Sequence, residues 1–274
     1  MNLRKAERQQ ARIKLGLQGP SGSGKTYSAL KIAYGLTGDW SKICVIDSEN
    51  NSSDLYAHLG HFNVLGIGQP FSPEKYIEAI QLAEKAGMEV IIIDSISHEW
   101  EGSGGILDIH SNVTGNSFTA WNKLTPRHNA LIQCVLQSKA HVIATIRSKQ
   151  DYVLSDKNGK MVPEKVGLKG VTRDNFDYDL TIVLELDIKH QATATKDRSG
   201  LFMDRPAFIP TEETGHRIKR WCHHTEDLDS IIADINGSDT IDQLRSILKE
   251  NVHLRPLIKD ALTRRSNELQ RQMQ

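Results

Sequence analysis

The chain has 274 residues, and its 34 lysines and arginines balance its 34 aspartates and glutamates. This length fits one large α/β domain plus a small appendage, while the neutral charge excludes a protein that binds nucleic acid over its whole surface. The sequence contains no apolar run of about 18 residues that would span a membrane, and its three scattered cysteines and charged, non-signal N-terminus predict a cytoplasmic setting.

The first predicted elements are a strand over residues 12–17 and a helix over residues 27–36, joined by a glycine-rich loop. The loop has the G-x-x-x-x-G-K-[ST] spacing of a phosphate-binding P-loop. Its glycines let backbone N–H groups approach an anion, Lys25 can reach the β and γ phosphates, and the Thr26 hydroxyl can bind Mg²⁺. The predicted nucleotide contacts are Gly19, Pro20, Ser21, Gly22, Ser23, Gly24, Lys25, Thr26 and Tyr27.

Two further predicted strands, residues 41–47 and 88–94, end in acidic residues. The carboxyl ends of parallel strands face the ligand crevice of an α/β sheet. Asp94, at the end of the more apolar strand, is the predicted Mg²⁺ ligand opposite Thr26. Glu49, just after the other strand, is the predicted base that deprotonates an attacking water. An alternative places Asp47 in the Mg²⁺ shell.

Helices are predicted between and after these strands. A short strand over residues 61–67 precedes a helix that begins at Ser72-Pro73 and ends near Gly87. Residues 97–116 are rich in glycine, serine and asparagine and predict a loop with little regular structure. Residues 116–139 predict one or two helices interrupted near Pro126. Trp100 and Trp121 are interpreted as core residues.

Residues 140–146 form the next predicted core strand, so strands and helices alternate as in a mostly parallel sheet flanked by helices. Thr145 and Arg147 at its end are candidate sensors of a γ-phosphate. The pattern then changes to a β-hairpin over residues 152–162 with an Asn-Gly turn, a mobile loop over residues 164–170, and an antiparallel strand pair over residues 180–186 and 191–196.

The segment from residue 139 to residue 173 carries more cations than acids. Together with Tyr152, this composition favours contact with single-stranded DNA, since such sites combine basic grooves with aromatic platforms. A solvated charged face is the alternative. The basic residues of this segment are Lys139, Arg147, Lys149, Lys157, Lys160, Lys165, Lys169 and Arg173.

From about residue 225 the sequence becomes helical and charged, which predicts domains at residues 1–222 and 223–274.

These motifs resemble those of the RecA recombinases. The resemblance implies that Glu49 is catalytic, that Tyr56 packs on adenine, and that Asp94 belongs to a Walker B strand. It also implies that Lys196 and Arg198 enter a neighbour's ATP site, and therefore that the chain forms a homo-oligomer with ATP sites between subunits. Thr145 stands where the RecA pattern has glutamine. The motifs are Ile46-Asp47-Ser48-Glu49, Leu55-Tyr56-Ala57, Ile93-Asp94-Ser95, Ala144-Thr145-Ile146-Arg147 and Lys196-Asp197-Arg198.

Roughly from residue 10 to residue 205, the chain is also similar to small RecA-like, AAA-type ATPases of phages and prophages. Some members act in single-strand annealing and recombination. The similarity implies a Mg²⁺-dependent ATPase of RecA fold that acts on single-stranded DNA in a bacterial cytoplasm, with a single-strand-binding protein as a candidate partner. Residues 223–274 resemble a short helical module found at the ends of phage recombination proteins.

Two alternatives keep the P-loop but change the activity. A small-molecule or nucleoside kinase would need an acceptor pocket and a lid, for which residues 125–128 are candidates. A non-hydrolysing module would bind DNA under the control of ATP without turnover. Glu49 argues against the second alternative, because a binding module needs no base.

Overall fold

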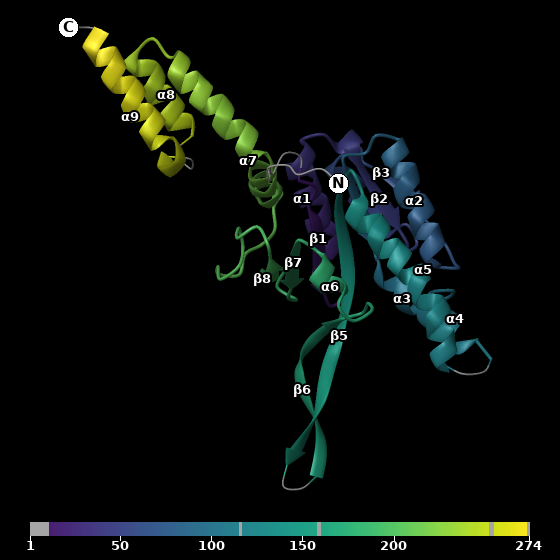
Figure 1. Cartoon of the computed structure of the whole chain (residues 1–274). Helices are drawn as coiled ribbons and strands as arrows, with labels where there is room; N and C mark the ends of the chain where they lie inside the picture. The colour runs from purple at the N-terminus through teal and green to yellow at the C-terminus, as the bar shows by residue number, and fades with distance from the viewer. Residues whose placement is uncertain (1–10, 115–116, 158–159, 252–254, 273–274) are drawn as a thin grey trace. The chain divides into compact units, whose positions relative to one another are not determined.

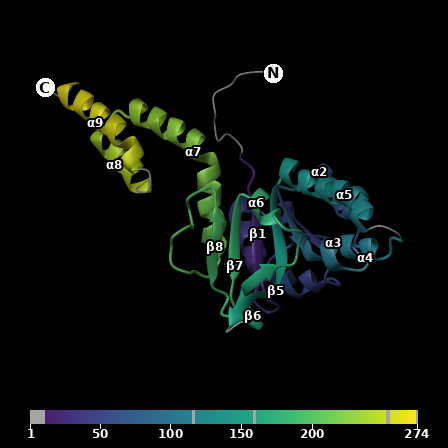
Figure 2. The same ribbon diagram turned by 60° about the horizontal axis from the view of Figure 1, so that its bottom comes forward.

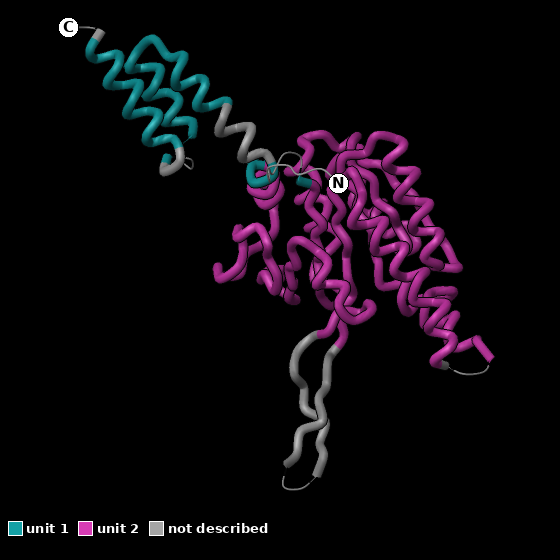
Figure 3. The backbone as a smooth tube through the Cα atoms, viewed as in Figure 1, with its two compact units in different colours: residues 1–11, 220–274 teal, residues 12–219 magenta. Residues whose placement is uncertain are grey.

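The computed structural model describes residues 11–114, 117–157, 160–251 and 255–272 (Figure 1). For residues 117, 150–157, 160–168, 223–229, 256–257 and 272 it describes the backbone alone. The chain divides into two compact units, one of residues 12–219 and the other of residues 1–11 and 220–274 (Figure 3). The domain boundary between residues 222 and 223 stays a prediction.

The first unit is built on a sheet whose order is β3-β2-β4-β5-β1-β7-β8, with β6 paired to β5, making eight strands among the described residues. Neighbours from β3 to β7 are parallel, while β7–β8 and β5–β6 are antiparallel. Strands β5, β1, β7 and β8 are seen side by side in Figure 2. The predicted mostly parallel α/β fold with an antiparallel extension is confirmed. The bounds are β1 Lys14–Gly19, β2 Ile43–Asp47, β3 Asn63–Gly66, β4 Val90–Asp94, β5 His141–Lys157, β6 Lys160–Gly170, β7 Ile182–Leu186 and β8 Ala192–Asp197.

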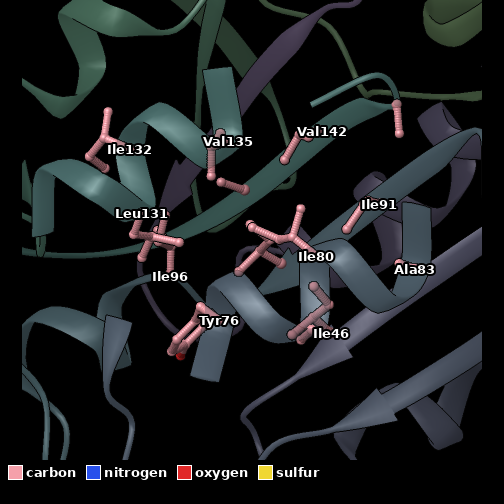
Figure 4. Packing of buried hydrophobic residues seen from close by; sticks show 14 of the residues in the cluster. Ile46, Tyr76, Ile80, Ala83, Ile91, Ile96, Leu131, Ile132, Val135 and Val142 are labelled. Atoms are coloured by element: carbon pink, nitrogen blue, oxygen red, sulfur yellow. The ribbon is translucent and has the colours of Figure 1, made fainter. Parts of the chain in front are cut away.

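The central strands are buried on both faces, as their β-branched sequences predict. On one face, helices α2 (Pro73–Lys85) and α5 (Ser117–Gln137) pack over β2, β4 and β5 (Figure 4). Tyr76, Ile80 and Leu131 are the helical side of this cluster, and each buried aliphatic side chain contributes about 1.5–3 kcal/mol. Helix α1 (Lys25–Thr37) contacts β1, β2, β4 and β5 and adds no residue to that cluster, so it covers the opposite face.

Two predictions for residues 97–139, one of a loop and one of an interrupted helix, are wrong. The expected loop contains helices α3 (Ser97–Glu101) and α4 (Ile106–Ser111), because Ile106 is fully buried and anchors the second of them. The expected interruption near Pro126 is absent from α5, which continues through the proline. The Pro126 ring lies on an exposed face, where helix distortion displaces no core neighbour.

The hairpin prediction is confirmed for the backbone, since β5 and β6 pair antiparallel from Ser148↔Gly170 to Lys157↔Lys160. Its Asn158-Gly159 turn lies outside the described residues. The predicted mobile loop over residues 164–170 is wrong, because these residues complete β6. The predicted antiparallel pair at residues 180–196 is confirmed as β7 and β8, and helix α6 (Phe176–Asp179) precedes β7.

The C-terminal region is helical, as predicted. It comprises the end of α7 (Glu212–Gly237), α8 (Ile241–Glu250) and α9 (Arg255–Gln272). A capping box at Thr240 begins α8, where the Thr240 side chain accepts from the Gln243 N–H. A small core of Ile235, Leu244, Ile258 and Leu269 holds this region together. Across the described residues, no helix has the length and apolarity needed to cross a membrane.

Candidate nucleotide-binding site

The P-loop connects β1 to α1 in a conformation that depends on its glycines. Gly22 and Gly24 have φ of +80° and +84°, a region that L side chains rarely adopt. A Cβ on Gly19 would stand 2.6 Å from the Leu186 carbonyl oxygen and from Ser23 Oγ. The first N–H groups of α1 have no intrahelical acceptors, so the loop and helix N-terminus together offer donors to an anion.

Lys25 begins α1, and its ammonium lies over the loop. Nζ donates to the carbonyl oxygens of Gly19 at 2.9 Å and Pro20 at 2.8 Å. Burial lowers the pKa of Lys25, and the negative charges of Asp94 and Glu49 oppose that shift. The cation is thus held where phosphate oxygens would replace the two carbonyls as acceptors.

Asp94 at the end of β4 is joined to the P-loop by hydrogen bonds. Thr26 Oγ1 donates to Asp94 Oδ2 at 2.7 Å, and Thr145 Oγ1 donates to Asp94 Oδ1 at 2.5 Å. Burial raises the pKa of the Asp94 carboxyl, and both threonine hydroxyls oppose the shift by stabilising the charged form. Thr145 is fully buried and does not line the pocket described below, so it orients Asp94.

The oxygen ligands of Thr26 and Asp94 fit Mg²⁺. This ion prefers oxygen donors and keeps most of its shell from water and phosphate, so two protein groups suffice. Within the described part of the chain, no cluster of three or more histidine, cysteine, aspartate or glutamate residues offers a protein-only metal cage. The alternative ligand Asp47 accepts from the N–H of Glu49 and from Ser53, and therefore serves the backbone turn after β2.

Glu49 and Arg147 form a bidentate ion pair beside the P-loop. Arg147 Nε donates to Glu49 Oε1 at 2.9 Å, and Arg147 Nη2 donates to Oε2. Strand β4 separates the two strands that carry these residues, and the strand register brings both to the same sheet edge. The sequence predicted each residue at the site but gave no indication that they contact each other.

A pocket of about 870 Å³ opens above the loop. Seven predicted contact residues line it, whereas Gly19, Pro20 and Ser23 are not among its lining residues. Tyr27 and Tyr56 meet edge to face with ring centroids 6.0 Å apart, a geometry that offers an apolar wall to a nucleobase. The predicted nucleotide contacts that line the pocket are Ser21, Gly22, Gly24, Lys25, Thr26, Tyr27 and Tyr56.

Several lining residues were missed from the sequence, and three of them come from the segment around and after β8. His190 lies in the β7–β8 turn, and a Cβ on Gly24 would stand 3.0 Å from its Nδ1. Ile209 and Pro210 follow the same strand pair in the chain and also line the pocket. No local motif marks these positions, because only the pairing of β1 with β7 brings them to the P-loop.

Lys196 and Arg198 lie at the end of β8, away from this pocket. Lys196 Nζ donates to the carbonyl oxygens of Asp177, at 2.9 Å, and of Tyr178, and Arg198 Nη2 donates to the Tyr178 carbonyl at 3.0 Å. Neither residue is among those that line the nucleotide pocket within the described chain.

A second groove, of about 640 Å³, adjoins the nucleotide pocket. Trp100 and Trp121 stack there with centroids 5.9 Å apart, and the Arg173 guanidinium lies 5.9 Å over the Trp121 ring. Both tryptophans are only partly buried, which corrects their interpretation as core residues. Lys149 and Val171 line both cavities and connect them. The side chains of Tyr152, Lys157, Lys160 and Lys165, which were predicted near DNA, lie outside those described.

A P-loop at the end of one strand, with an acidic Walker B strand two places along the sheet, defines a P-loop nucleotide-binding domain. Consistent with this class, the family model AAA_24, an AAA domain, matches residues 11–209, which is more than half of the chain. The chain belongs to this AAA-domain family. No curated protein matches it.

Proposed function

We propose that the protein is a Mg²⁺-dependent ATPase. The observation that carries this proposal is the convergence of Lys25, Glu49 and Arg147 on one pocket above the P-loop. The N–H groups of the loop and Lys25 bind the phosphates, and Tyr27 with Tyr56 contacts adenine. Mg²⁺, held by Thr26 and Asp94, neutralises phosphate charge when it is bound.

In the proposed reaction, a water oxygen attacks the γ-phosphorus in line with the bond to ADP. That bond breaks, the water proton passes to Glu49, and ADP and inorganic phosphate leave. In the structure both Glu49 oxygens accept from Arg147, so the carboxylate is held against the guanidinium and keeps one lone pair on each oxygen. A γ-phosphate is an anion that would attract Arg147 away from this pair, in line with its proposed role as sensor, and would free Glu49 to face the water.

We place single-stranded DNA in the groove beside the pocket. Stacked tryptophans with Arg173, Lys149 and Lys169 combine the aromatic surface and cations that single strands require. Lys149 lines both the groove and the nucleotide pocket, so the proposed sites of DNA binding and of ATP hydrolysis share this residue of β5. With the resemblance to phage and prophage ATPases, this supports a role in recombination or annealing in a bacterial cytoplasm, alongside a single-strand-binding protein.

A phosphate-release assay tests this proposal and distinguishes it from a kinase and from a non-hydrolysing DNA-binding module. Purified protein should release inorganic phosphate from ATP only when Mg²⁺ is present, and single-stranded DNA should stimulate release. The stimulation should weaken steeply between 50 and 200 mM salt, and Lys149→Ala should lower the salt slope of DNA binding by about one. A phosphorylated metabolite instead of free phosphate would establish the kinase, and ATP-dependent DNA binding without phosphate release would establish the non-hydrolysing module.

We further propose that Lys196 and Arg198 complete the ATP site of a neighbouring subunit in a homo-oligomer. Arg198→Ala should then assemble normally and lose about 10³-fold or more in kcat, the range of arginine fingers. Lys25→Ala should also be inactive by itself. Mixing the two variants should restore activity. Where the P-loop of an Arg198→Ala subunit faces a Lys25→Ala subunit, the site has both an intact Lys25 and an intact Arg198. Normal hydrolysis by assembled Arg198→Ala would remove the proposed finger.

A further inference from the structure

His98 lies beside Glu49 and belongs to none of the roles assigned above. It is the second residue of α3, directly after the Asp94 strand end, and its ring stacks on Phe71 with centroids 4.9 Å apart. Its Nδ1 lies 2.8 Å from Ser48 Oγ, and its Nε2 lies 3.9 Å from Glu49 Oε1. The ring is thus fixed on one side, and its other nitrogen faces the proposed base.

The hydrogen bonds around Ser48 favour one nitrogen of His98 as the one that carries the proton. The Ser48 hydroxyl has one proton and three acceptors near it, namely the carbonyls of Asp94 and Ser95 and the imidazole Nδ1. The Asp94 carbonyl already accepts from the Ser48 N–H at 2.7 Å. The Ser95 carbonyl already accepts from Tyr76 Oη at 3.0 Å. Because Nδ1 is the closest of the three acceptors and both carbonyls have another donor, we infer that the hydroxyl donates to Nδ1 and that the imidazole proton lies on Nε2.

This tautomer directs an N–H group toward Glu49. In the ligand-free arrangement the Oε1 atom of Glu49 accepts from Arg147 Nε at 2.9 Å, and His98 Nε2 stands behind at 3.9 Å. When Arg147 turns to a phosphate, Oε1 loses its donor. A shift of about 1 Å then brings Oε1 to hydrogen-bonding distance of Nε2.

We propose that His98 is a positioning residue for Glu49, whose Oε1 it holds through Nε2–H once Arg147 has released the carboxylate. The inference rests on the proposed ATP hydrolysis. One oxygen held by His98 leaves Oε2 to accept the water proton. A neutral N–H donor suits this task better than the guanidinium, because it orients the carboxylate without neutralising it. In the ligand-free arrangement burial lowers the pKa of His98, and the Arg147 charge lowers it further against the opposing charges of Glu49 and Glu101.

Two substitutions test the roles of the two ring nitrogens of His98 separately. The amide of His98→Asn reaches the place of Nδ1 and keeps the Ser48 contact, whereas the longer His98→Gln can present its NH₂ group where Nε2 lies. We expect His98→Asn to lower kcat about 10²-fold with KM for ATP unchanged, as misplacement of a reacting group does, and His98→Gln to recover part of that loss. His58→Asn, an exposed histidine outside the pocket, is the control and should match the wild type.

The tautomer is measured independently of hydrolysis. Full-length protein labelled with ¹⁵N-histidine, with His98→Asn used to assign the signal, should show the Nε2–H form without nucleotide. The Nδ1–H form, or equal kcat values for wild type, His98→Asn and His98→Gln, would overturn the inference. A wild type that releases no phosphate would instead overturn the proposed function, and the NMR measurement would still decide the tautomer of His98.

Discussion

Glu49→Gln is expected to bind ATP as tightly as the wild type and to lose about 10²- to 10⁴-fold in kcat, the range that general base catalysis supplies. Glutamine has nearly the same size as glutamate and still offers an oxygen to Arg147, but it cannot accept the proton of the attacking water. The P-loop, Thr26 and Asp94 are unaffected, so binding remains. Isothermal titration with ATP and Mg²⁺, followed by single-turnover phosphate release, measures both quantities.

Glu74→Gln is the matched control for this variant. Glu74 accepts from Arg127 Nε at 2.7 Å and from Nη2 at 2.8 Å, the same bidentate pattern as the Glu49–Arg147 pair, and it lies outside the pocket. That hydrogen bond to Arg127 lowers the pKa of Glu74 to about 2. Loss of an exposed pair costs at most about 1 kcal/mol of stability, so Glu74→Gln should keep full kcat. Unchanged hydrolysis in Glu49→Gln would show that another group activates the water.

The parts of the site that lie along one local segment could be predicted from the sequence. The P-loop spacing dictates its own backbone turn, and an apolar strand that ends in Asp94 predicts a carboxylate at the sheet edge. Tyr56 follows β2 at a fixed short distance and reaches the same pocket. In each case the chemistry depends on residues that are close in the chain.

Contacts that depend on strand order could not be predicted. Thr145 was expected at the γ-phosphate, yet the register of β4 against β5 turns its hydroxyl to Asp94. The Glu49–Arg147 pair joins residues 98 positions apart across an intervening strand. His190 reaches Gly24 only because β7 lies beside β1. A single sequence carries no signal for such neighbours, since propensity and spacing describe local structure.

The missed helices α3 and α4 show how tertiary packing overrides local propensity. Glycine and serine predicted a loop after Asp94, but Ile106 is buried against the core and Glu99 forms a buried pair with His128 of α5 at 3.0 Å. These contacts fix α3, and α3 carries His98. Because the composition of this segment predicted a loop, nothing in the sequence indicated that His98 lies beside the proposed base.

Arg147 has two roles with opposite consequences for activity. As the partner of Glu49 it holds both oxygens of the proposed base against the guanidinium, so removing it would free the carboxylate and raise hydrolysis. As the proposed sensor it stabilises charge on the γ-phosphate in the transition state, so removing it would lower hydrolysis. An electrostatic donor aimed at developing charge is worth about 10²- to 10³-fold in rate. Release of a carboxylate from one ion pair that is partly exposed to solvent is worth less, because solvent screens such pairs.

Arg147→Ala is therefore expected to lower kcat about 10²- to 10³-fold rather than to raise it. The variant should bind ADP normally and lose affinity for ADP with a metal fluoride that mimics the transferring phosphoryl group, because Arg147 acts on the γ-position alone. Arg127→Ala removes the matched arginine outside the pocket and should change neither quantity. Faster hydrolysis by Arg147→Ala would mean that the residue only restrains Glu49. The γ-phosphate would then need a different cation, and both Lys25 and Lys149 line the same pocket.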